Sequence, residues 1–293
     1  MLPETTEISP KLHLRREDLS HPFYGGNKLR KLKYNLLKAR AEGYDTILTF
    51  GGAWSNHIYA TAAACKEHNF KSIGVIRGEE PQQYSTTLQF ARDQGMKLHF
   101  VSRSEYREKH EDFFKAWLRD VHGRFYLVPE GGSNFLGVQG CMEILSLADK
   151  QNYTHIAVSA GTGATAAGLL LSSAPTQHIL VFPALKDPDY IRDQISKHVY
   201  SVLMDPESTE ELMTRLQVIS GYEEGGYARV SDRLLEFMRQ FRNDHHIELD
   251  AVYTGKMMMG LTNELRGTTF GECPKILAIH TGGLQGNAGL MKG

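Results

Sequence analysis

Short apolar segments alternate with longer helical patterns along this chain, and this alternation limits the possible folds more than any other feature. The expected strands are rich in apolar and β-branched residues: Thr46–Phe50, Ser72–Arg77, Leu98–Val101, Phe125–Val128, His155–Ser159, Ile179–Phe182, Leu249–Tyr253 and Lys275–His280, with a weaker candidate at Tyr227–Val230. Strands that are apolar along their whole length are buried on both faces. The pattern therefore predicts an α/β protein with parallel-rich sheets covered by helices on both sides.

The composition excludes several classes of protein. The chain has 293 residues, of which 41% are hydrophobic and 23% charged, as in a folded globular protein of one or two domains. Lys and Arg number 33 against 34 for Asp and Glu, so no excess of positive charge points to nucleic acid or an anionic membrane. The sequence has neither a run of about 20 apolar residues nor a secretory signal. We expect a cytoplasmic protein with no nucleic-acid or membrane partner.

Cysteine and histidine usage gives no sign of a metal site. Cys65, Cys141 and Cys273 lie far apart without a CxxC pair, so we expect free thiols in a reducing compartment. The 13 histidines include no HExxH spacing, and we expect no bound metal. The sequence also lacks the GxxxxGK[ST] motif of a P-loop and the GxSxG motif of many serine hydrolases.

Ligands bind open parallel sheets at the carboxyl ends of the strands, which is where the glycines of this chain gather. Lys28 follows two glycines (GGNK) and precedes a helical pattern, so we expect it near a helix N-terminus. Positive potential and desolvation there lower a lysine pKa and yield the neutral amine that Schiff-base chemistry requires. The alternative is a solvated lysine in a basic cluster with Arg30, Lys31 and Lys33.

Two further loops contain polar groups next to glycines. Ser55 and Asn56 follow Gly51-Gly52, where Ser55 is either a helix N-cap alone or also a hydrogen-bond partner for a ligand. The loop at Gly161–Thr165 (GTGAT) leads into an Ala/Leu-rich helix and predicts a phosphate cradle. The same loop also fits the GxGxxA pattern of dinucleotide-binding oxidoreductases, with Asp187 as the ribose partner. A plain strand-to-helix turn is the third possibility.

Taken together, these motifs resemble one enzyme family. RREDL, GGNKLRKL, FGGAWSNHIYATAAA, PEGGSNFLG, AGTGATAAG, VYTGK and IHTGG occur in the same order as in the 1-aminocyclopropane-1-carboxylate deaminase and D-cysteine desulfhydrase family. The resemblance runs from about Leu14 to Gly283. It implies a pyridoxal 5'-phosphate enzyme with the tryptophan synthase β-like fold (fold type II), in which the cofactor lies in a cleft between two α/β domains.

The resemblance also implies roles for individual residues. Lys28 matches the lysine that bonds to the cofactor aldehyde and later moves the substrate α-proton. Ser55 matches a serine that faces the substrate carboxylate and that is proposed to act more directly on the substrate in deaminases. Tyr227 and Tyr253 match two active-site tyrosines near the substrate β-carbon. The implied cofactor-binding residues are Lys28, Asn56 (the phenolic oxygen), Gly161, Thr162, Gly163, Ala164 and Thr165 (the phosphate), Thr254 (the pyridine nitrogen) and Thr281.

The identity of residue 254 helps to distinguish between the two activities of this family. Deaminases of this family have glutamate at this position (YEGK), whereas the desulfhydrases have threonine, as here. A hydroxyl can hydrogen-bond a neutral ring nitrogen but cannot supply the charge that keeps it protonated. The resemblance therefore favours β-elimination from D-cysteine to pyruvate, ammonia and hydrogen sulfide. The alternative within the family is 1-aminocyclopropane-1-carboxylate deamination to 2-oxobutyrate and ammonia, and an inactive ligand-binding homologue is a third reading.

The chain also departs from the family pattern. Trp54 stands where relatives have a smaller polar residue such as glutamine, which affects the shape of the carboxylate pocket. The chain is shorter than typical members, at the N-terminus and around Asp187–Glu224.

From the family we expect a larger domain formed by residues 1–34 and 151–293, a smaller inserted α/β domain at 35–150, and a homodimer.

Overall fold

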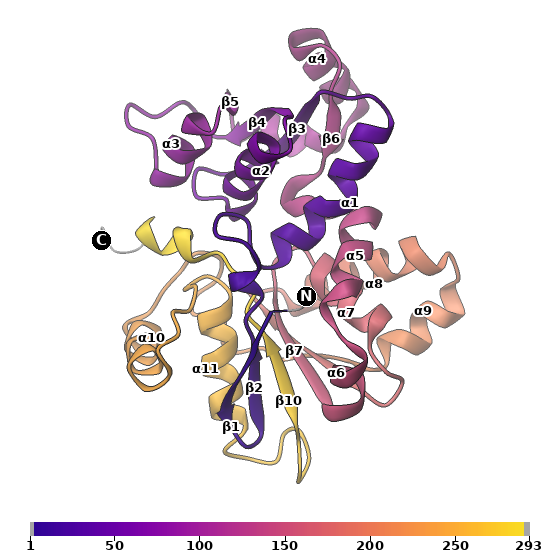
Figure 1. The fold of residues 1–293 in the computed structure, drawn as a ribbon, viewed down its shortest axis with the longest axis vertical. Coiled ribbons are helices and arrows are strands. Elements are labelled where there is room, and N and C mark those ends of the chain that lie inside the picture. Colours follow the sequence, from indigo (N-terminus) through magenta and orange to yellow (C-terminus); the bar gives the residue numbers. More distant parts are fainter. Residues whose placement is uncertain (1–2, 290–293) are drawn as a thin grey trace.

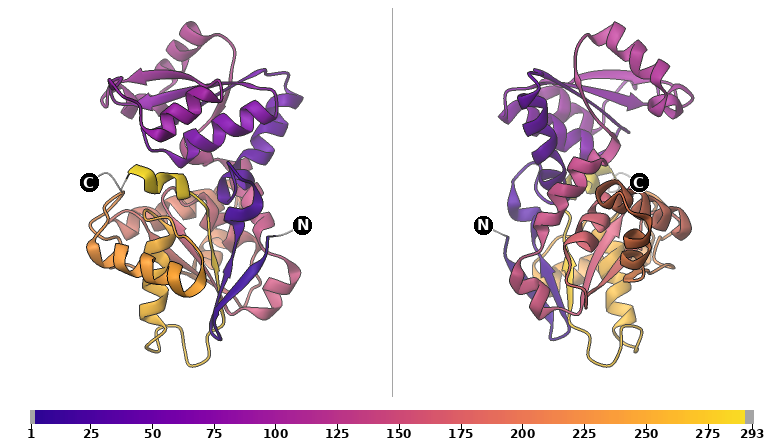
Figure 2. Two further views of the ribbon diagram at one scale, coloured as in Figure 1. Left: turned by 60° about the vertical axis from the view of Figure 1, so that its left-hand side comes forward. Right: turned by 90° about the vertical axis from the view of Figure 1, so that its right-hand side faces the viewer.

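A computed structural model describes residues 3–289 and contains two β-sheets flanked by helices (Figure 1). The predicted α/β class is confirmed. One sheet has six strands in the order β1-β2-β10-β7-β8-β9, and the other has four in the order β5-β4-β3-β6. Within each sheet every pairing is parallel except that between β1 and β2. Figure 2 shows the module built on the four-stranded sheet stacked on the module built on the six-stranded sheet.

The strands are short and mostly buried. The six-stranded sheet contains β1 (Thr5–Ser9), β2 (Leu12–Arg15), β7 (His155–Ala160), β8 (His178–Pro183), β9 (Leu216–Val218) and β10 (Ile276–Ile279). The four-stranded sheet contains β3 (Thr46–Gly51), β4 (Lys71–Arg77), β5 (Lys97–Val101) and β6 (Tyr126–Val128). All six residues of β3 and all six of β7 are buried, as expected for central parallel strands with helices on both faces.

Helices cover both faces of each sheet. The α-helices are α1 (Asn27–Ala41), α2 (Asn56–Glu67), α3 (Thr86–Asp93), α4 (Asp112–His122), α5 (Phe135–Cys141), α6 (Leu147–Asn152), α7 (Ala164–Ser172), α8 (Pro188–Leu203), α9 (Pro206–Met213), α10 (Asp232–His245) and α11 (Thr254–Glu264). The 3-10 helices are η1 (Glu17–Ser20), η2 (Glu105–His110), η3 (Glu130–Gly132), η4 (Met142–Ile144) and η5 (Leu284–Gly289). On the four-stranded sheet, α1 and α2 pack on the face of Ile47, and α4 packs on the face of Leu48. On the six-stranded sheet, α7 and α8 pack on one face and α10 and α11 on the other.

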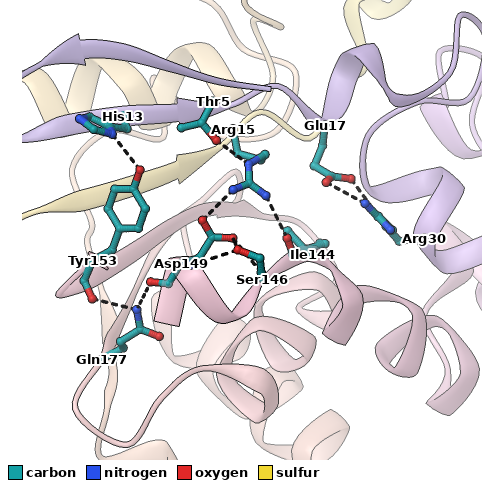
Figure 3. A network of polar contacts seen from close by, with 10 residues as sticks. All are labelled: Thr5, His13, Arg15, Glu17, Arg30, Ile144, Ser146, Asp149, Tyr153 and Gln177. Atoms are coloured by element: carbon teal, nitrogen blue, oxygen red, sulfur yellow. Dashed lines mark hydrogen bonds and ion pairs between the residues drawn. The ribbon is translucent and has the colours of Figure 1, made fainter. Parts of the chain in front are cut away.

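Buried charges connect the N-terminal segment to the rest of the molecule (Figure 3). Arg15 of β2 donates a 2.7 Å hydrogen bond to Asp149 of α6, and both side chains are almost completely buried. The guanidinium of Arg30 on α1 donates two 2.9 Å bonds to the fully buried carboxylate of Glu17. The second pair fixes the N-terminal half of α1, and with it the position of Lys28.

Two predicted strands are wrong. The segment Leu249–Tyr253 forms a turn, because the carboxylate of Asp250 accepts hydrogen bonds from the backbone N–H groups of Tyr253 and Thr254. Tyr227–Val230 is also irregular, and Ala228 lies in the left-handed region at φ +55°, which a strand does not permit. The strands β1, β2 and β9 were not predicted, since TTEIS, LHLR and LQV are short and partly polar.

The proposed division at residues 34/35 falls inside α1, which packs against α2 and α5. The inserted domain at 35–150 stays a prediction, and residues 1–2 and 290–293 of its larger partner lie outside the described residues. Within residues 3–289 there is no helix whose length and apolar character would let it cross a membrane.

Candidate active site

A cavity of about 800 Å³ lies where strands of both sheets end. Its wall includes the loops that follow β3, β6, β7 and β10 and the last residue of β4, so the parallel strands direct their carboxyl ends toward one space. Ligand sites in α/β proteins form at such strand ends. The sequence places its glycines and hydroxyl side chains in the same loops.

The structure brings almost all of the predicted site residues together in this cavity. The lining includes Lys28, Ser55, Asn56, Gly161, Thr162, Gly163, Thr165, Tyr227, Tyr253 and Thr281. Ala164 and Thr254 do not line it. Each is the first residue of a helix, α7 and α11 respectively, and each is fully buried.

Lys28 lies in the first turn of α1, as predicted, and its position depends on Gly26. A Cβ atom at position 26 would lie 2.1 Å from the carbonyl oxygen of Thr281, and Gly26 has φ +81°, so only glycine fits. The chain therefore passes directly against the loop that follows β10.

The Nζ atom of Lys28 donates a 3.0 Å hydrogen bond to Asn27 Oδ1. Burial, together with the charge of Lys31, lowers the pKa of Lys28 to about 7.

The first turns of α1 and α7 contact each other at the predicted phosphate cradle. Asn27 Nδ2 donates a 3.0 Å hydrogen bond to Thr165 Oγ1. The Nζ atom of Lys31, one turn after Lys28, lies 3.4 Å from Thr162 Oγ1. The first N–H groups of α7 have no intrahelical acceptor and carry the positive end of the helix dipole. A buried ammonium and a helix N-terminus thus converge on one point, which suits a phosphate.

Gly161 leaves the room that such a ligand needs. A Cβ atom there would lie 3.1 Å from the hydroxyl oxygen of Tyr253, and Gly163 adopts φ +81° as the N-cap of α7. The Oγ atom of Ser159, just before this loop, is buried with no hydrogen-bond partner among the described residues. An unsatisfied buried hydroxyl at the wall of a cavity indicates a position where a ligand supplies the missing bond.

Ser55 and Asn56 form the opposite wall. Ser55 is the N-cap of α2, as predicted, and its Oγ accepts 3.2 Å bonds from the N–H groups of His57 and Ile58. Because the oxygen only accepts in these bonds, its own proton remains available to a ligand in the cavity. Asn56 Oδ1 accepts a 2.9 Å bond from Gln285, which leaves the Asn56 amide hydrogens as donors.

The two predicted tyrosines face each other in the cavity wall. The rings of Tyr227 and Tyr253 are 6.2 Å apart, centroid to centroid, and nearly perpendicular. Burial raises the pKa of Tyr253 well above its ordinary value, and partial desolvation at the cavity wall raises that of Tyr227, which is 48% exposed. Both hydroxyls therefore carry their protons near neutral pH and can donate hydrogen bonds.

Asp250 is a buried carboxylate that sequence reasoning missed, although it lies only three residues before Tyr253. Its Oδ1 accepts bonds of 2.7 and 3.0 Å from the N–H groups of Tyr253 and Thr254, and its Oδ2 has no hydrogen-bond partner within residues 3–289. Burial raises the pKa of Asp250 to about 6, against the opposing effect of these N–H groups and Lys28. Thr254 Oγ1 is also without a partner in the described part of the chain.

Other lining residues were also missed. Lys31 could have been found from its spacing, since a residue three positions after Lys28 lies on the same helix face. Arg77 ends β4 and Glu130 follows β6, but nothing in their local sequence separates them from other surface charges. No group of three or more His, Cys, Asp or Glu side chains in the described chain could hold a metal ion.

Comparison with known proteins identifies the family. A family model described as pyridoxal-phosphate dependent enzyme matches residues 2–282. The chain belongs to this family. Its relatives include the bifunctional D-cysteine desulfhydrase/1-aminocyclopropane-1-carboxylate deaminase of Arabidopsis thaliana, which is 32% identical over 97% of this chain and 74% of the relative. A putative 1-aminocyclopropane-1-carboxylate deaminase of Pyrococcus horikoshii is 29% identical over 96% of this chain and 86% of the relative.

Solved structures agree with this assignment. The crystal structure of an ACC deaminase homologue is 26% identical, covers 94% of this chain and 85% of its own, and superposes with a TM-score of 0.75. The predicted tryptophan synthase β-like fold (fold type II) and the resemblance to the deaminase and desulfhydrase family are confirmed.

The residues present fit the pyridoxal phosphate of this pyridoxal-phosphate dependent enzyme. Lys28 offers a neutral amine, and the loop at 161–165 with Lys31 offers an anion site. Ser159 Oγ and Thr254 Oγ1 have no hydrogen-bond partner among residues 3–289. The dinucleotide reading of GxGxxA is wrong. Asp187, its expected ribose partner, instead caps α8, where Oδ1 accepts a 2.9 Å bond from the N–H of Tyr190.

Proposed function

We propose that this pyridoxal-phosphate dependent enzyme catalyses β-elimination from D-cysteine, which with water gives pyruvate, ammonia and hydrogen sulfide. The observation that carries this proposal is Thr254, an uncharged residue at the position where the resemblance expects glutamate in a deaminase. Its hydroxyl is fully buried and has no protein partner in the described chain. The names of the relatives include both activities, which supports considering this pair of reactions.

When bound, pyridoxal phosphate supplies the electron sink that makes the substrate α-proton acidic and allows the β-substituent to leave. The protein supplies orientation and proton transfer. We assign Lys31, Thr162, Gly163, Ala164 and Thr165 to the phosphate, Asn56 to the phenolic oxygen, and Thr254 and Thr281 to polar contacts at the ring. Thr254 Oγ1 can donate to a ring nitrogen but leaves it uncharged, which suffices for expulsion of thiolate, a good leaving group.

The α-carboxylate of the substrate is assigned to the loop between β3 and α2. Ser55 Oγ has its proton available, and the first N–H groups of α2 carry the positive end of the helix dipole. The guanidinium of Arg77 lines the same side of the cavity, 3.6 Å from the position that a Cβ of residue 52 would occupy. These three features favour an amino acid as substrate.

Proton transfer at the α-carbon is assigned to Lys28 Nζ. With a pKa of about 7 a large fraction of the amine is neutral at physiological pH and can accept the proton. Tyr253 and Tyr227, both protonated, are assigned to donate hydrogen bonds toward the β-substituent, which stabilise the negative charge on the sulfur as it leaves.

An assay with two substrates tests the proposal. Purified protein loaded with pyridoxal phosphate is given D-cysteine or 1-aminocyclopropane-1-carboxylate, with L-cysteine as a control for handedness, and sulfide, ammonia, pyruvate and 2-oxobutyrate are measured. Sulfide and pyruvate in equal amounts from D-cysteine are expected. Production of 2-oxobutyrate alone would establish the deaminase instead, and no product from either substrate would favour a ligand-binding homologue.

We also propose that the enzyme acts as a homodimer in the cytoplasm. Cys65, Cys141 and Cys273 are all free thiols, consistent with a reducing compartment. Light scattering coupled to size exclusion separates a monomer of 32.9 kDa from a dimer.

A further inference from the structure

Lys256 is a buried lysine that the reaction itself does not use. It lies in the first turn of α11, two residues after Thr254, and is only 1% exposed. Its Nζ donates hydrogen bonds of 2.8 Å to the carbonyl oxygen of Glu223 and 2.9 Å to that of Gly226. It forms no ion pair with a described residue. Burying an ammonium against carbonyl groups alone costs desolvation that an apolar side chain of similar length would avoid.

The loop that Lys256 holds, residues 223–228, has an unusual backbone. Glu224 and Ala228 lie in the left-handed region at φ +50° and +55°, and Gly225 and Gly226 have φ +92° and +114°. Non-glycine residues are disfavoured in this region and persist only where surrounding contacts enforce them. The same two carbonyl oxygens also accept backbone hydrogen bonds from within the loop. That of Glu223 accepts from the N–H of Gly226, and that of Gly226 accepts from the N–H of Arg229. Lys256 therefore joins both ends of the strained turn.

This loop carries Tyr227. The ring of Tyr227 lines the cavity in edge-to-face contact with Tyr253, which lies three residues before Lys256. On its other side the loop is attached to the start of α10, where Glu224 accepts a hydrogen bond from Ser231 and pairs with Arg233. Lys256 thus connects the start of α11, where Tyr253 lies, to the loop that bears the facing tyrosine.

We propose that Lys256 is a positioning residue that holds loop 223–228 so that Tyr227 stays in edge-to-face contact with Tyr253 at the wall of the active-site cavity. The catalytic consequence rests on the proposed function, whereas the effect on the loop does not. Lys256→Met removes the three donors and keeps much of the side-chain volume. Lys71→Met, on a lysine that makes only an exposed pair with Asp45, is the matched control.

The first readout is hydrogen–deuterium exchange of the enzyme with and without pyridoxal phosphate. In Lys256→Met, peptides spanning residues 223–230 should exchange at least about tenfold faster, while peptides from β3 and β7 remain as protected as in the wild type. Lys71→Met should show no change. If Lys256→Met fails to fold, Lys256→Gln serves instead, because it removes the ammonium and keeps a polar side chain in the buried position. Unchanged exchange at 223–230 in whichever of these two variants folds would overturn the proposal.

The second readout is a double-mutant cycle with Tyr227→Phe, followed by kcat and KM for the active substrate. Lys256→Met alone should lower kcat by up to about 10²-fold, as expected for a displaced active-site group. In the Tyr227→Phe background the same change should lower kcat by less than about threefold, because the group it positions is absent. A merely structural lysine would give equal effects in both backgrounds, which contradicts the proposal. Faster loop exchange with no effect of Tyr227→Phe on kcat would support the role of Lys256 and refute the assignment of Tyr227.

Discussion

The side chain of Asn27 donates a 3.0 Å hydrogen bond to the hydroxyl of Thr165, and this contact joins the first turn of α1 to the first turn of α7. Lys28 follows Asn27 directly, and Thr165 ends the glycine loop that begins at Gly161. The amine and the anion site therefore have a fixed separation, set by two helix starts and not by mobile side chains. The same geometry leads to predictions on stability, titration, cofactor affinity and specificity.

Glu17→Gln should destabilise the protein by about 3 kcal/mol, since it leaves the guanidinium of Arg30 without its main buried partner. Urea unfolding measures the free-energy change. Asp45→Asn, which breaks an exposed pair with Lys71, should destabilise the protein far less. Equal effects of the two substitutions would show that the Glu17–Arg30 pair does not hold α1 in place.

The pKa of Lys28 predicts how the stability of the cofactor-free enzyme depends on pH. Because its pKa is about 7 in the folded state and 10.5 as the ordinary value, the unfolded chain binds more protons between these pH values. Lys28 therefore destabilises the fold most below pH 7, and its penalty shrinks as pH rises toward 10.5. Relative to wild type, Lys28→Met should be more stabilising at pH 7 than at pH 9, by at most about 1.4 kcal/mol per pH unit. Lys33→Met should not show this pH-dependent difference, and a Lys28→Met effect that is the same at both pH values would refute the low pKa.

Lys31→Ala should weaken the binding of pyridoxal phosphate to the cofactor-free enzyme by about 10-fold to 100-fold. The reason is the loss of one charge-assisted contact, worth about 1.5–3 kcal/mol, at the anion site beside Thr162. Fluorescence titration gives the Kd. Lys33→Ala, on the exposed side of the same helix, is the control and should leave the Kd unchanged. The same Kd in both variants would place the phosphate elsewhere.

Thr254→Glu should shift the enzyme from D-cysteine toward 1-aminocyclopropane-1-carboxylate. A carboxylate at this position can keep the ring nitrogen protonated, and opening a cyclopropane needs the stronger electron withdrawal that results. We expect the ratio of kcat/KM for the two substrates to change by at least about tenfold in favour of the cyclopropane, with Thr254→Ser as the control that keeps the hydroxyl. A change of less than about twofold would remove Thr254 as the basis of the choice between the reactions.

The fold was predictable from the sequence where strands are buried on both faces. TILTF is apolar or β-branched throughout and HIAVS is so at its three central positions, and they form the central strands β3 and β7. LDAVY has the same appearance but forms a turn, because the side chain of Asp250 competes for the backbone N–H groups of the following residues. The periodicity of apolar residues cannot predict such a local hydrogen bond between a side chain and the backbone.

The candidate site was predictable where its residues belong to a short glycine-containing motif. Lys28, Ser55 and Gly161 lie next to glycines after strands, and all three line the cavity. The roles of Lys256 and Asp250 could not be predicted, because each depends on the path of a chain segment that is distant in sequence or turns back on itself. The carbonyls of Glu223 and Gly226, which Lys256 holds, are 33 and 30 residues away from it.

The most direct test of the central claim is to locate the cofactor linkage. The enzyme loaded with pyridoxal phosphate is reduced with borohydride, digested, and its peptides are analysed by mass spectrometry. The reduced cofactor should be found on Lys28 and on no other lysine, with loss of the visible absorption band. A label on Lys31 or Lys256, or an unlabelled protein that nevertheless turns over substrate, would contradict the assignment of Lys28.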